Sequence, residues 1–289
     1  MLHGFAHDSI ARGSKSFALA SQLFDRETRE RVWLLYAWCR AADDLTDGQD
    51  HGGAMQPGHD PAAAVARIRT QTDKAFAGEP TGDMAFDALG FLLTEVAIPR
   101  WVIDDIVAGF ELDAKDWRPR SEADLLRYSY HVAGAVGVAM ALVMGVDPAD
   151  ETTLDRASDL GIAFQLANIA RDVAEDAARG RIYLPQSMLE KHSVDESDIL
   201  EGRFTVGYEN AAQEIAERAW AHYRLARESF PLEQKHQLVA SEAMGAIYWR
   251  LLMKLRAVRY NAFQSNRRRL KTGRLAKLAI GLKTWLWLR

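Results

Sequence analysis

The chain has 289 residues, of which 48% are hydrophobic and 26% charged, enough for one large domain with a substantial core. Its single cysteine, Cys39, excludes a disulfide framework and a cysteine-rich zinc site. The polar N-terminal segment lacks the apolar region of a signal peptide, and no apolar run reaches the ~18 residues of a membrane span, so we expect a cytoplasmic protein.

The net charge of −4 hides a strong asymmetry between the body of the chain and its C-terminal region. No Asp or Glu follows Glu242, whereas the 47 residues after it include 12 Lys and Arg. A basic region attached to an acidic body predicts an anionic partner for that region. Nucleic acid, anionic lipid and a polyphosphate substrate all satisfy this condition.

The predicted elements are helices throughout the chain. Helical periodicity and alanine-rich composition predict helices at residues 25–45, 61–78, 122–145, 153–180 and 208–230. Clusters of Gly and Pro predict breaks at residues 48–61, 78–83, 117–121, 145–150 and 193–207. Because no alternating β-branched strands occur, we expect residues 1–289 to form a single all-α domain, a bundle of roughly eight to twelve helices.

The first predicted helix ends in RAADDLTDG, residues 40–48, which holds three carboxylates. At ~100° per residue, one narrow stripe of this helix contains Tyr36, Arg40, Asp43 and Asp47. Asp44 lies off the centre of the stripe, and its role stays open. The surrounding residues of RVWLLYAWC are apolar, which indicates a buried helix whose polar stripe lines a cavity.

A second polar stripe occurs in FQLANIARDVAEDAARGRIYLP, residues 164–185. Its members are Gln165, Asn168, Asp172 and Asp176, which span only about 80° of arc. The stripe again lies on a helix that is otherwise apolar at its start, GIAFQLANIA. An exposed face explains the acids at its end but is a poor explanation for Gln165 and Asn168.

Two carboxylate faces of this kind have a specific chemical use. Mg²⁺ prefers oxygen ligands and is often held by one or two carboxylates together with substrate phosphate oxygens. The two faces, opposed across a bundle, predict a site for Mg²⁺, with Mn²⁺ as an alternative, that binds a diphosphate and stabilises it as a leaving group. A di-iron site is disfavoured because Glu-x-x-His pairs are missing, and no Gly-x-Gly-x-x-Gly unit supports hydride transfer.

Four segments of the chain resemble the squalene/phytoene synthase family in sequence, order and spacing. They are GSKSF (13–17), YAWCRAADDLTD (36–47), YSYHVAGAVG (128–137) and QLANIARDVAEDAARGRIYLP (165–185). The resemblance extends from about residue 9 to about residue 270, and the segment DAARGRIYLP is most similar to bacterial phytoene-forming members. It implies an isoprenoid synthase fold with a central active-site cavity.

The resemblance also implies roles for individual residues. The metal-binding residues would be Asp43, Asp47, Asn168, Asp172 and Asp176. Residues that contact diphosphate or order the metal ligands would be Ser14, Lys15, Ser16, Arg40, Gln165, Asn168 and Arg171. Near the reacting carbons, where electron-rich rings stabilise carbocations, would lie Tyr36, Tyr128 and Tyr248. A plain core role remains open for Tyr248.

The implied reaction is the Mg²⁺-dependent head-to-head condensation of two geranylgeranyl diphosphates, the first committed step of carotenoid biosynthesis. Loss of diphosphate from one molecule leaves an allylic cation, and the 2,3-double bond of the second attacks it to give prephytoene diphosphate. A second ionisation, rearrangement and proton loss give phytoene, so no NADPH is expected. The alternatives are a dehydrosqualene or squalene-type synthase that uses farnesyl diphosphate, and a non-catalytic helical scaffold of the same fold.

The apolar residues expected to line the hydrocarbon tunnel, with ordinary helix packing as the alternative, are Ala133, Val136, Val138, Ala139, Leu142, Ile162 and Phe164. The basic C-terminal segment, residues 270–289, has leucines and a tryptophan near one face. Such a helix can lie on an anionic membrane surface, and a final bundle helix is the equal alternative. Nucleic acid is not expected as a partner because no binding module is recognisable.

Overall fold

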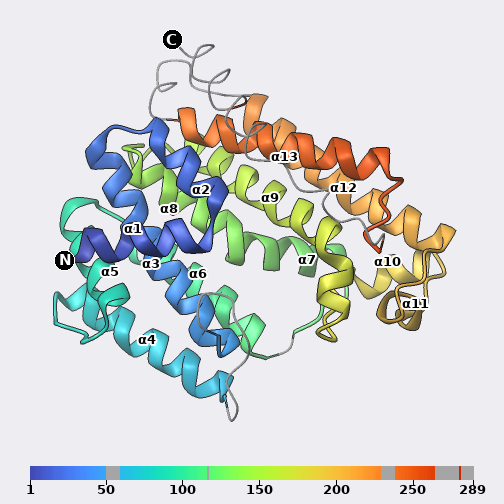
Figure 1. Ribbon diagram of the computed structural model, residues 1–289, viewed down its shortest axis with the longest axis horizontal. Helices are drawn as coiled ribbons and strands as arrows, with labels where there is room; N and C mark the ends of the chain where they lie inside the picture. The colour runs from blue at the N-terminus through green and yellow to red at the C-terminus, as the bar shows by residue number, and fades with distance from the viewer. Residues whose placement is uncertain (50–58, 116, 229–237, 264–279, 281–289) are drawn as a thin grey trace.

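The computed structural model describes residues 1–49, 59–115, 117–228, 238–263 and 280, and every regular element within them is a helix (Figure 1). The predicted all-α fold is therefore confirmed. The α-helices are α1 (Leu2–Gly13), α2 (Lys15–Ala20), α3 (Arg26–Asp47), α4 (Pro61–Ala77), α5 (Met84–Glu95), α6 (Arg100–Ala114), α7 (Glu122–Ser129), α8 (Ala135–Val143), α9 (Glu151–Ala177), α10 (Gln186–Lys191), α11 (Glu196–Leu200), α12 (Val206–Glu228) and α13 (Val239–Ala257). A 3₁₀ turn, η1 (Ser21–Leu23), and a π turn, η2 (Tyr130–Gly134), complete the set.

Local sequence explains where the helices begin and end. Asp25 caps α3 by accepting the Thr28 N–H at 2.9 Å, and Asp60 caps α4 in the same way. Gly48 ends α3 with φ 62°, a left-handed conformation that glycine adopts without strain. The five predicted helices are present with bounds shifted by a few residues, but the break predicted at 193–207 contains the short helix α11.

The core is divided into two parts by the long helix α9, which crosses the middle of the bundle in Figure 1. One part is built by α1, α3, α5, α6 and α8 around large buried side chains such as Trp38 and Phe86. The other joins α9 to α12 through residues such as Leu166 and Ile215, both fully buried. The helices of both parts contribute residues to a cavity beside α9.

The segments α7, η2 and α8 form one continuous helical stretch, Glu122–Val143, which packs against α6 and α9. By length and composition alone this stretch could cross a membrane, although half of its most apolar window is buried inside the bundle. It was not predicted as a possible membrane span, because it contains no uninterrupted apolar run of ~18 residues. Its packing on both neighbouring helices is that of a core helix.

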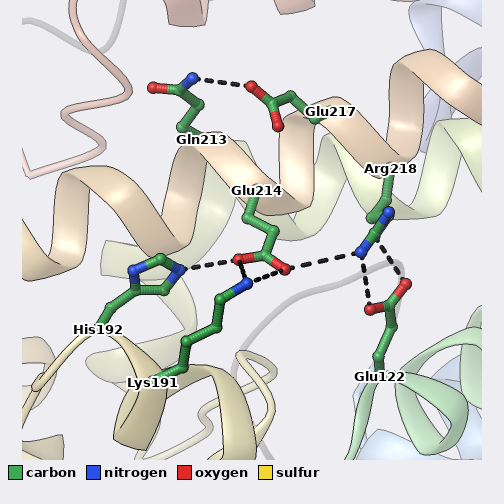
Figure 2. A network of polar contacts seen from close by, with 7 residues as sticks. All are labelled: Glu122, Lys191, His192, Gln213, Glu214, Glu217 and Arg218. Carbon is green, nitrogen blue, oxygen red and sulfur yellow. Dashed lines mark hydrogen bonds and ion pairs between the residues drawn. The ribbon is translucent and has the colours of Figure 1, made fainter.

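A polar network clamps the end of α10 and the start of α7 to the side of α12 (Figure 2). The Glu214 carboxylate on α12 lies 2.8 Å from both Lys191 Nζ and His192 Nε2. One turn later, Arg218 Nη2 donates to Glu122 Oε2 on α7 at 3.0 Å. These contacts hold the chain that follows α9 against the bundle.

Candidate active site

A cavity of about 380 Å³ lies between α3, α8, α9 and α13 and is lined mainly by apolar side chains. Polar groups gather at one end of it, where the two predicted stripes meet. From α3 come Tyr36, Arg40 and Asp43, and from α9 come Gln165 and Asn168. The structure therefore brings together residues that are more than 120 positions apart in the sequence.

On α3, Arg40 organises the first stripe. Its Nη1 donates to Asp43 Oδ2 at 3.0 Å, and its Nε donates to Asp44 Oδ2 at 3.2 Å. Arg40 and Asp44 are 20% and 13% exposed, so this pair is largely shielded from solvent. Asp44, whose role the sequence left open, thus helps to fix the guanidinium group that faces the cavity.

The negative charge of Asp43 is unfavourable in its surroundings. Its side chain is 46% accessible because it faces the cavity, yet it is surrounded by protein. This burial raises the pKa of Asp43 to about 7 against the opposing effect of Arg40, and repulsion from Asp47 and Asp113 adds to the increase. A cation at this position would relieve that repulsion.

The second stripe, on α9, shows the same electrostatic pattern. Asp172 accepts a hydrogen bond from Arg171 Nε at 2.6 Å. Asp176 lies one turn further, where burial and repulsion from Asp172 raise its pKa to about 7. Asn168 Oδ1 is buried and has no hydrogen-bond partner, an arrangement that is costly unless a ligand completes it.

A salt bridge joins the first stripe to the chain that follows α9. Arg181, in the chain after α9, donates from Nη2 to Asp47 Oδ1 at 3.0 Å. Asp113 on α6 belongs to the same cluster, because Asp47 raises the pKa of its carboxyl group and Arg181 lowers it. Burial raises the pKa of Asp113 to about 6, while the hydrogen bond from Tyr128 lowers it. Neither Arg181 nor Asp113 is among the predicted site residues, because nothing in the local sequence pattern places α6 or the chain after α9 beside Asp47.

Tyr128 is not one of the residues that line the cavity. It is 3% exposed, stacks between Trp117 and Tyr183 at centroid distances of 5.1 and 5.2 Å, and donates its hydroxyl to Asp113 Oδ1 at 2.8 Å. In this structure Tyr128 therefore orients a carboxylate. Tyr36 and Tyr248 do line the cavity, and Tyr248 stacks on Phe164 with centroids 4.1 Å apart.

The GSKSF segment forms the corner between α1 and α2, next to Tyr36. A Cβ atom on Gly13 would lie 2.3 Å from the Tyr36 hydroxyl oxygen, so a larger residue at this position would displace the Tyr36 ring. The Ser14 hydroxyl accepts the Phe17 N–H at 3.3 Å and caps α2. Lys15 is exposed, and the side chain of Ser16 lies outside the described part of the structure. Phe17 is the residue of this segment that lines the cavity.

The apolar lining agrees in part with the prediction. Ala133, Val136 and Phe164 line the cavity, joined by Gly137, Met140 and Leu160. The other four predicted lining residues are buried in helix packing instead, and they are Val138, Ala139, Leu142 and Ile162. Only one face of α8 can point into the cavity, and the face that does so contains Val136, Gly137 and Met140.

The donor set fits Mg²⁺, which prefers carboxylate and amide oxygens. The described residues contain no preassembled group of three or more His, Cys, Asp and Glu side chains at metal-binding distance. Arginines neutralise several of the carboxylates instead, as in the pairs Arg40–Asp43 and Arg181–Asp47. The unpartnered Asn168 oxygen and the raised pKa values of Asp43 and Asp176 are the features that a cation would satisfy.

Comparison with known proteins gives matches along nearly the whole chain. The family model described as Squalene/phytoene synthase matches residues 10–276. A phytoene synthase of Pseudescherichia vulneris is 49% identical over 188 residues, which are 64% of this chain and 60% of that protein. A 15-cis-phytoene synthase of Pantoea ananas is 41% identical over 75% of this chain and 71% of its own length. A crystal structure of a dehydrosqualene synthase superposes with a TM-score of 0.86 at 27% identity, covering 99% of this chain and 96% of the other.

Proposed function

Because the chain belongs to the squalene/phytoene synthase family, we propose that it condenses two molecules of geranylgeranyl diphosphate head to head to give phytoene. The observation that carries this proposal is the meeting of two polar helix stripes at one end of an apolar cavity, with Arg40 and Asp43 from α3 and Asn168 from α9. The carboxylates Asp172 and Asp176 continue the α9 stripe beyond the lining residues. A diphosphate needs the charged end, and a prenyl chain needs the apolar remainder. The relatives of Pseudescherichia vulneris and Pantoea ananas are named phytoene synthases and favour this product. The superposed crystal structure is of a dehydrosqualene synthase, which corresponds to the alternative product.

The proposed metal ligands are Asp43, Asp47, Asn168, Asp172 and Asp176. Magnesium held there, or manganese in its place, would neutralise the diphosphate and assist its departure. Arg40 and Arg171 lie beside these carboxylates, where guanidinium groups can bind diphosphate oxygens directly. Gln165 lines the cavity between the charged end and the apolar wall and would orient the diphosphate through its amide.

The aromatic residues of the cavity act on the hydrocarbon part of the reaction. Loss of diphosphate breaks the bond from C1 to oxygen and leaves an allylic cation, which the double bond of the second molecule attacks. The faces of Tyr36 and Tyr248 stabilise positive charge on carbon, and the apolar lining excludes water that would quench the cation. Asp113, held by Tyr128, supports the charge of Arg181 next to Asp47.

Substrate assays with mass analysis of the hydrocarbon test this function. The protein is incubated with geranylgeranyl or farnesyl diphosphate, with Mg²⁺ or EDTA, and with or without NADPH. We expect a 40-carbon product from the 20-carbon substrate that requires Mg²⁺ and is unchanged by NADPH. A 30-carbon product would favour the dehydrosqualene or squalene-type alternative, and no product from either substrate would favour a non-catalytic scaffold.

Residues 270–289 lie outside the described residues except for Ile280, so membrane contact by this segment stays a prediction. We propose a cytoplasmic protein that contacts anionic membrane peripherally through this basic segment, since its substrates and product are lipids. Deletion of residues 273–289 should reduce binding to vesicles that contain anionic lipid. Unchanged vesicle binding would contradict this part of the proposal. Nucleic acid is still not expected as a partner.

A further inference from the structure

The long axis of the cavity runs along helix α9. Lining residues occur along α9 from Asn168 back to Thr153, a separation that corresponds to about 22 Å at 1.5 Å per residue. Asn168 marks the charged end where the diphosphate is proposed to bind. Thr153 and Arg156 mark the opposite end, which an ordinary hydrocarbon pocket would close with apolar side chains.

The opposite end instead contains an ion pair. Arg227 of α12 and Glu242 of α13 both line the cavity, and Arg227 Nη2 lies 3.2 Å from Glu242 Oε2. Ser241 lines the same region, with its hydroxyl 3.7 Å from Met144 Sδ at the end of α8.

Contacts between the helices place this pair at the far end from the diphosphate. Tyr248 of α13 stacks on Phe164, and a Cβ atom on Gly245, one turn earlier, would contact Leu160. Glu242 lies one further turn in the same direction, toward Thr153. On α12, His222 Nδ1 lies 2.9 Å from Asp159 Oδ1, and Arg227 follows more than a turn later.

The ion pair is costly to disturb. Glu242 is only 9% exposed, whereas 41% of the Arg227 side chain is accessible. Burial raises the pKa of Glu242 while Arg227 opposes the increase. Arg227 also donates from Nη1 to the Tyr223 hydroxyl at 3.0 Å, which fixes the guanidinium group. Hydrocarbon pressed against such a pair would remove its remaining contact with water, at a considerable free-energy cost.

The span of lining residues along α9, about 22 Å, is close to the length of one prenyl chain in particular. The main chain of a 20-carbon tail has 16 carbons and extends about 20 Å at roughly 1.3 Å per bond, whereas a 25-carbon tail extends about 25 Å. We propose that the Arg227–Glu242 ion pair is the floor of the prenyl cavity and sets an upper limit of four isoprene units on the tail. This inference rests on the proposed function, because it assumes a prenyl diphosphate anchored near Asn168.

Binding measurements test the floor separately from catalysis. The probes are the unreactive thiolodiphosphate analogues of the 20-carbon and 25-carbon substrates, with Mg²⁺, and their dissociation constants are measured by calorimetry. The test variant is R227M/E242M, which replaces the ion pair by apolar side chains of similar length. The matched control is R259M/E209M. It removes another Arg–Glu pair, between α12 and the residues just after α13, in which Arg259 Nη2 lies 2.7 Å from Glu209 Oε2. This pair does not line the cavity.

We expect R227M/E242M to shift the preference toward the 25-carbon analogue by roughly tenfold, the value of an extra apolar group in a pocket. Arg227→Lys, which keeps the ion pair, and the control variant should retain the preference of the unmodified protein. If the double variant does not fold, R227Q/E242Q removes both charges with little change in size and should shift the preference in the same direction by a smaller factor.

An unchanged preference in R227M/E242M, or an equal shift in R259M/E209M, would contradict the proposal that this ion pair limits the length of the tail. Turnover of geranylgeranyl diphosphate is measured in parallel on the unmodified protein. If discrimination by the floor is found but no 40-carbon product forms, the inference about the ion pair stands and the proposed function fails.

Discussion

At the scale of single residues, the site is a set of carboxylates held in an unfavourable state by the fold. Asp43 and Asp176 have pKa values raised to about 7, chiefly by burial. Arg40 and Arg181 offset part of this repulsion through salt bridges to Asp43, Asp44 and Asp47. The carboxylate charge that lowers the stability of the free protein would bind a cation, and the cation would in turn bind the diphosphate.

The substitution Asp43→Asn distinguishes the effect of this charge on stability from its effect on catalysis. The amide keeps the shape but removes the charge, so we expect turnover to fall at least roughly a hundredfold, as when other charge-stabilising groups are removed from active sites. At pH 8 the metal-free variant should unfold at a higher temperature than the parent. The measurements are product formation and thermal unfolding, and full activity in the variant would contradict the role of Asp43.

Cys39 is the only cysteine of the chain and lines the cavity. Burial, with a smaller contribution from Asp43, raises the pKa of its thiol to about 12. Because the thiolate is the reactive form, we expect a disulfide reagent to label the native protein very slowly at pH 8 and the unfolded protein rapidly. Labelling at equal rates in both states would show that the thiol is neither buried nor shifted.

At the scale of elements, glycines control how closely the helices around the cavity approach. A Cβ atom on Gly161 of α9 would lie 2.2 Å from the Ala133 carbonyl oxygen in η2, and one on Gly137 of α8 would lie 2.2 Å from the Ala157 carbonyl oxygen. Both obstacles are backbone atoms, which cannot turn aside as a side chain can. The distance of α9 from η2 and α8, which together form one wall of the cavity, therefore depends on these two glycines.

Gly161→Ala should lower the free energy of unfolding by about 1–3 kcal/mol, because the two helices must separate. Gly4→Ala is the matched control, since Gly4 lies in α1 with no atom within 4 Å of the added Cβ. Alanine favours the helix there by up to about 1 kcal/mol. Denaturant unfolding measures both changes, and an equal effect of the two substitutions would contradict the packing argument.

The helices and the two polar stripes were predictable from the sequence because helical periodicity is a local property. Tyr36, Arg40 and Asp43 line the cavity as the spacing predicts. Asp113 and Arg181 were not predictable, since their place in the site depends on how α6 and the chain after α9 pack.

The π turn at residues 130–134 was also not predictable from a regular period. Such a turn inserts an extra residue and changes which side chains face a neighbour. The turn precedes Val136, Gly137 and Met140, the residues of α8 that line the cavity. Tyr128, before the turn, does not line the cavity, and its predicted role near the reacting carbons stays a prediction.

At the scale of the whole molecule, the site couples stability to pH and to metal. For Asp43 and Asp176 the pKa in the folded state is about 7, above the ordinary value of 3.8. The folded state therefore binds more protons than the unfolded state between about pH 4 and pH 7, and these groups make stability fall as the pH rises through that range.

Magnesium with inorganic pyrophosphate should reverse this loss. We expect the increase in unfolding temperature on adding both ligands to be larger at pH 8 than at pH 6, because protons compete with the metal at the lower pH. Thermal scans of the parent and of D43N/D176N measure the effect, and the double variant should lose most of it. Equal stabilisation at both pH values would contradict the assignment of these carboxylates.

The central claim, head-to-head condensation, is tested most directly by labelling the carbon that changes partners. Geranylgeranyl diphosphate carrying ¹³C at C1 is incubated with the protein and Mg²⁺, and the product is analysed by ¹³C NMR. We predict a 40-carbon hydrocarbon in which the two labelled carbons are bonded to each other and split each other's signals. A product without this coupling, such as an elongated diphosphate or a 20-carbon alcohol, would contradict the claim.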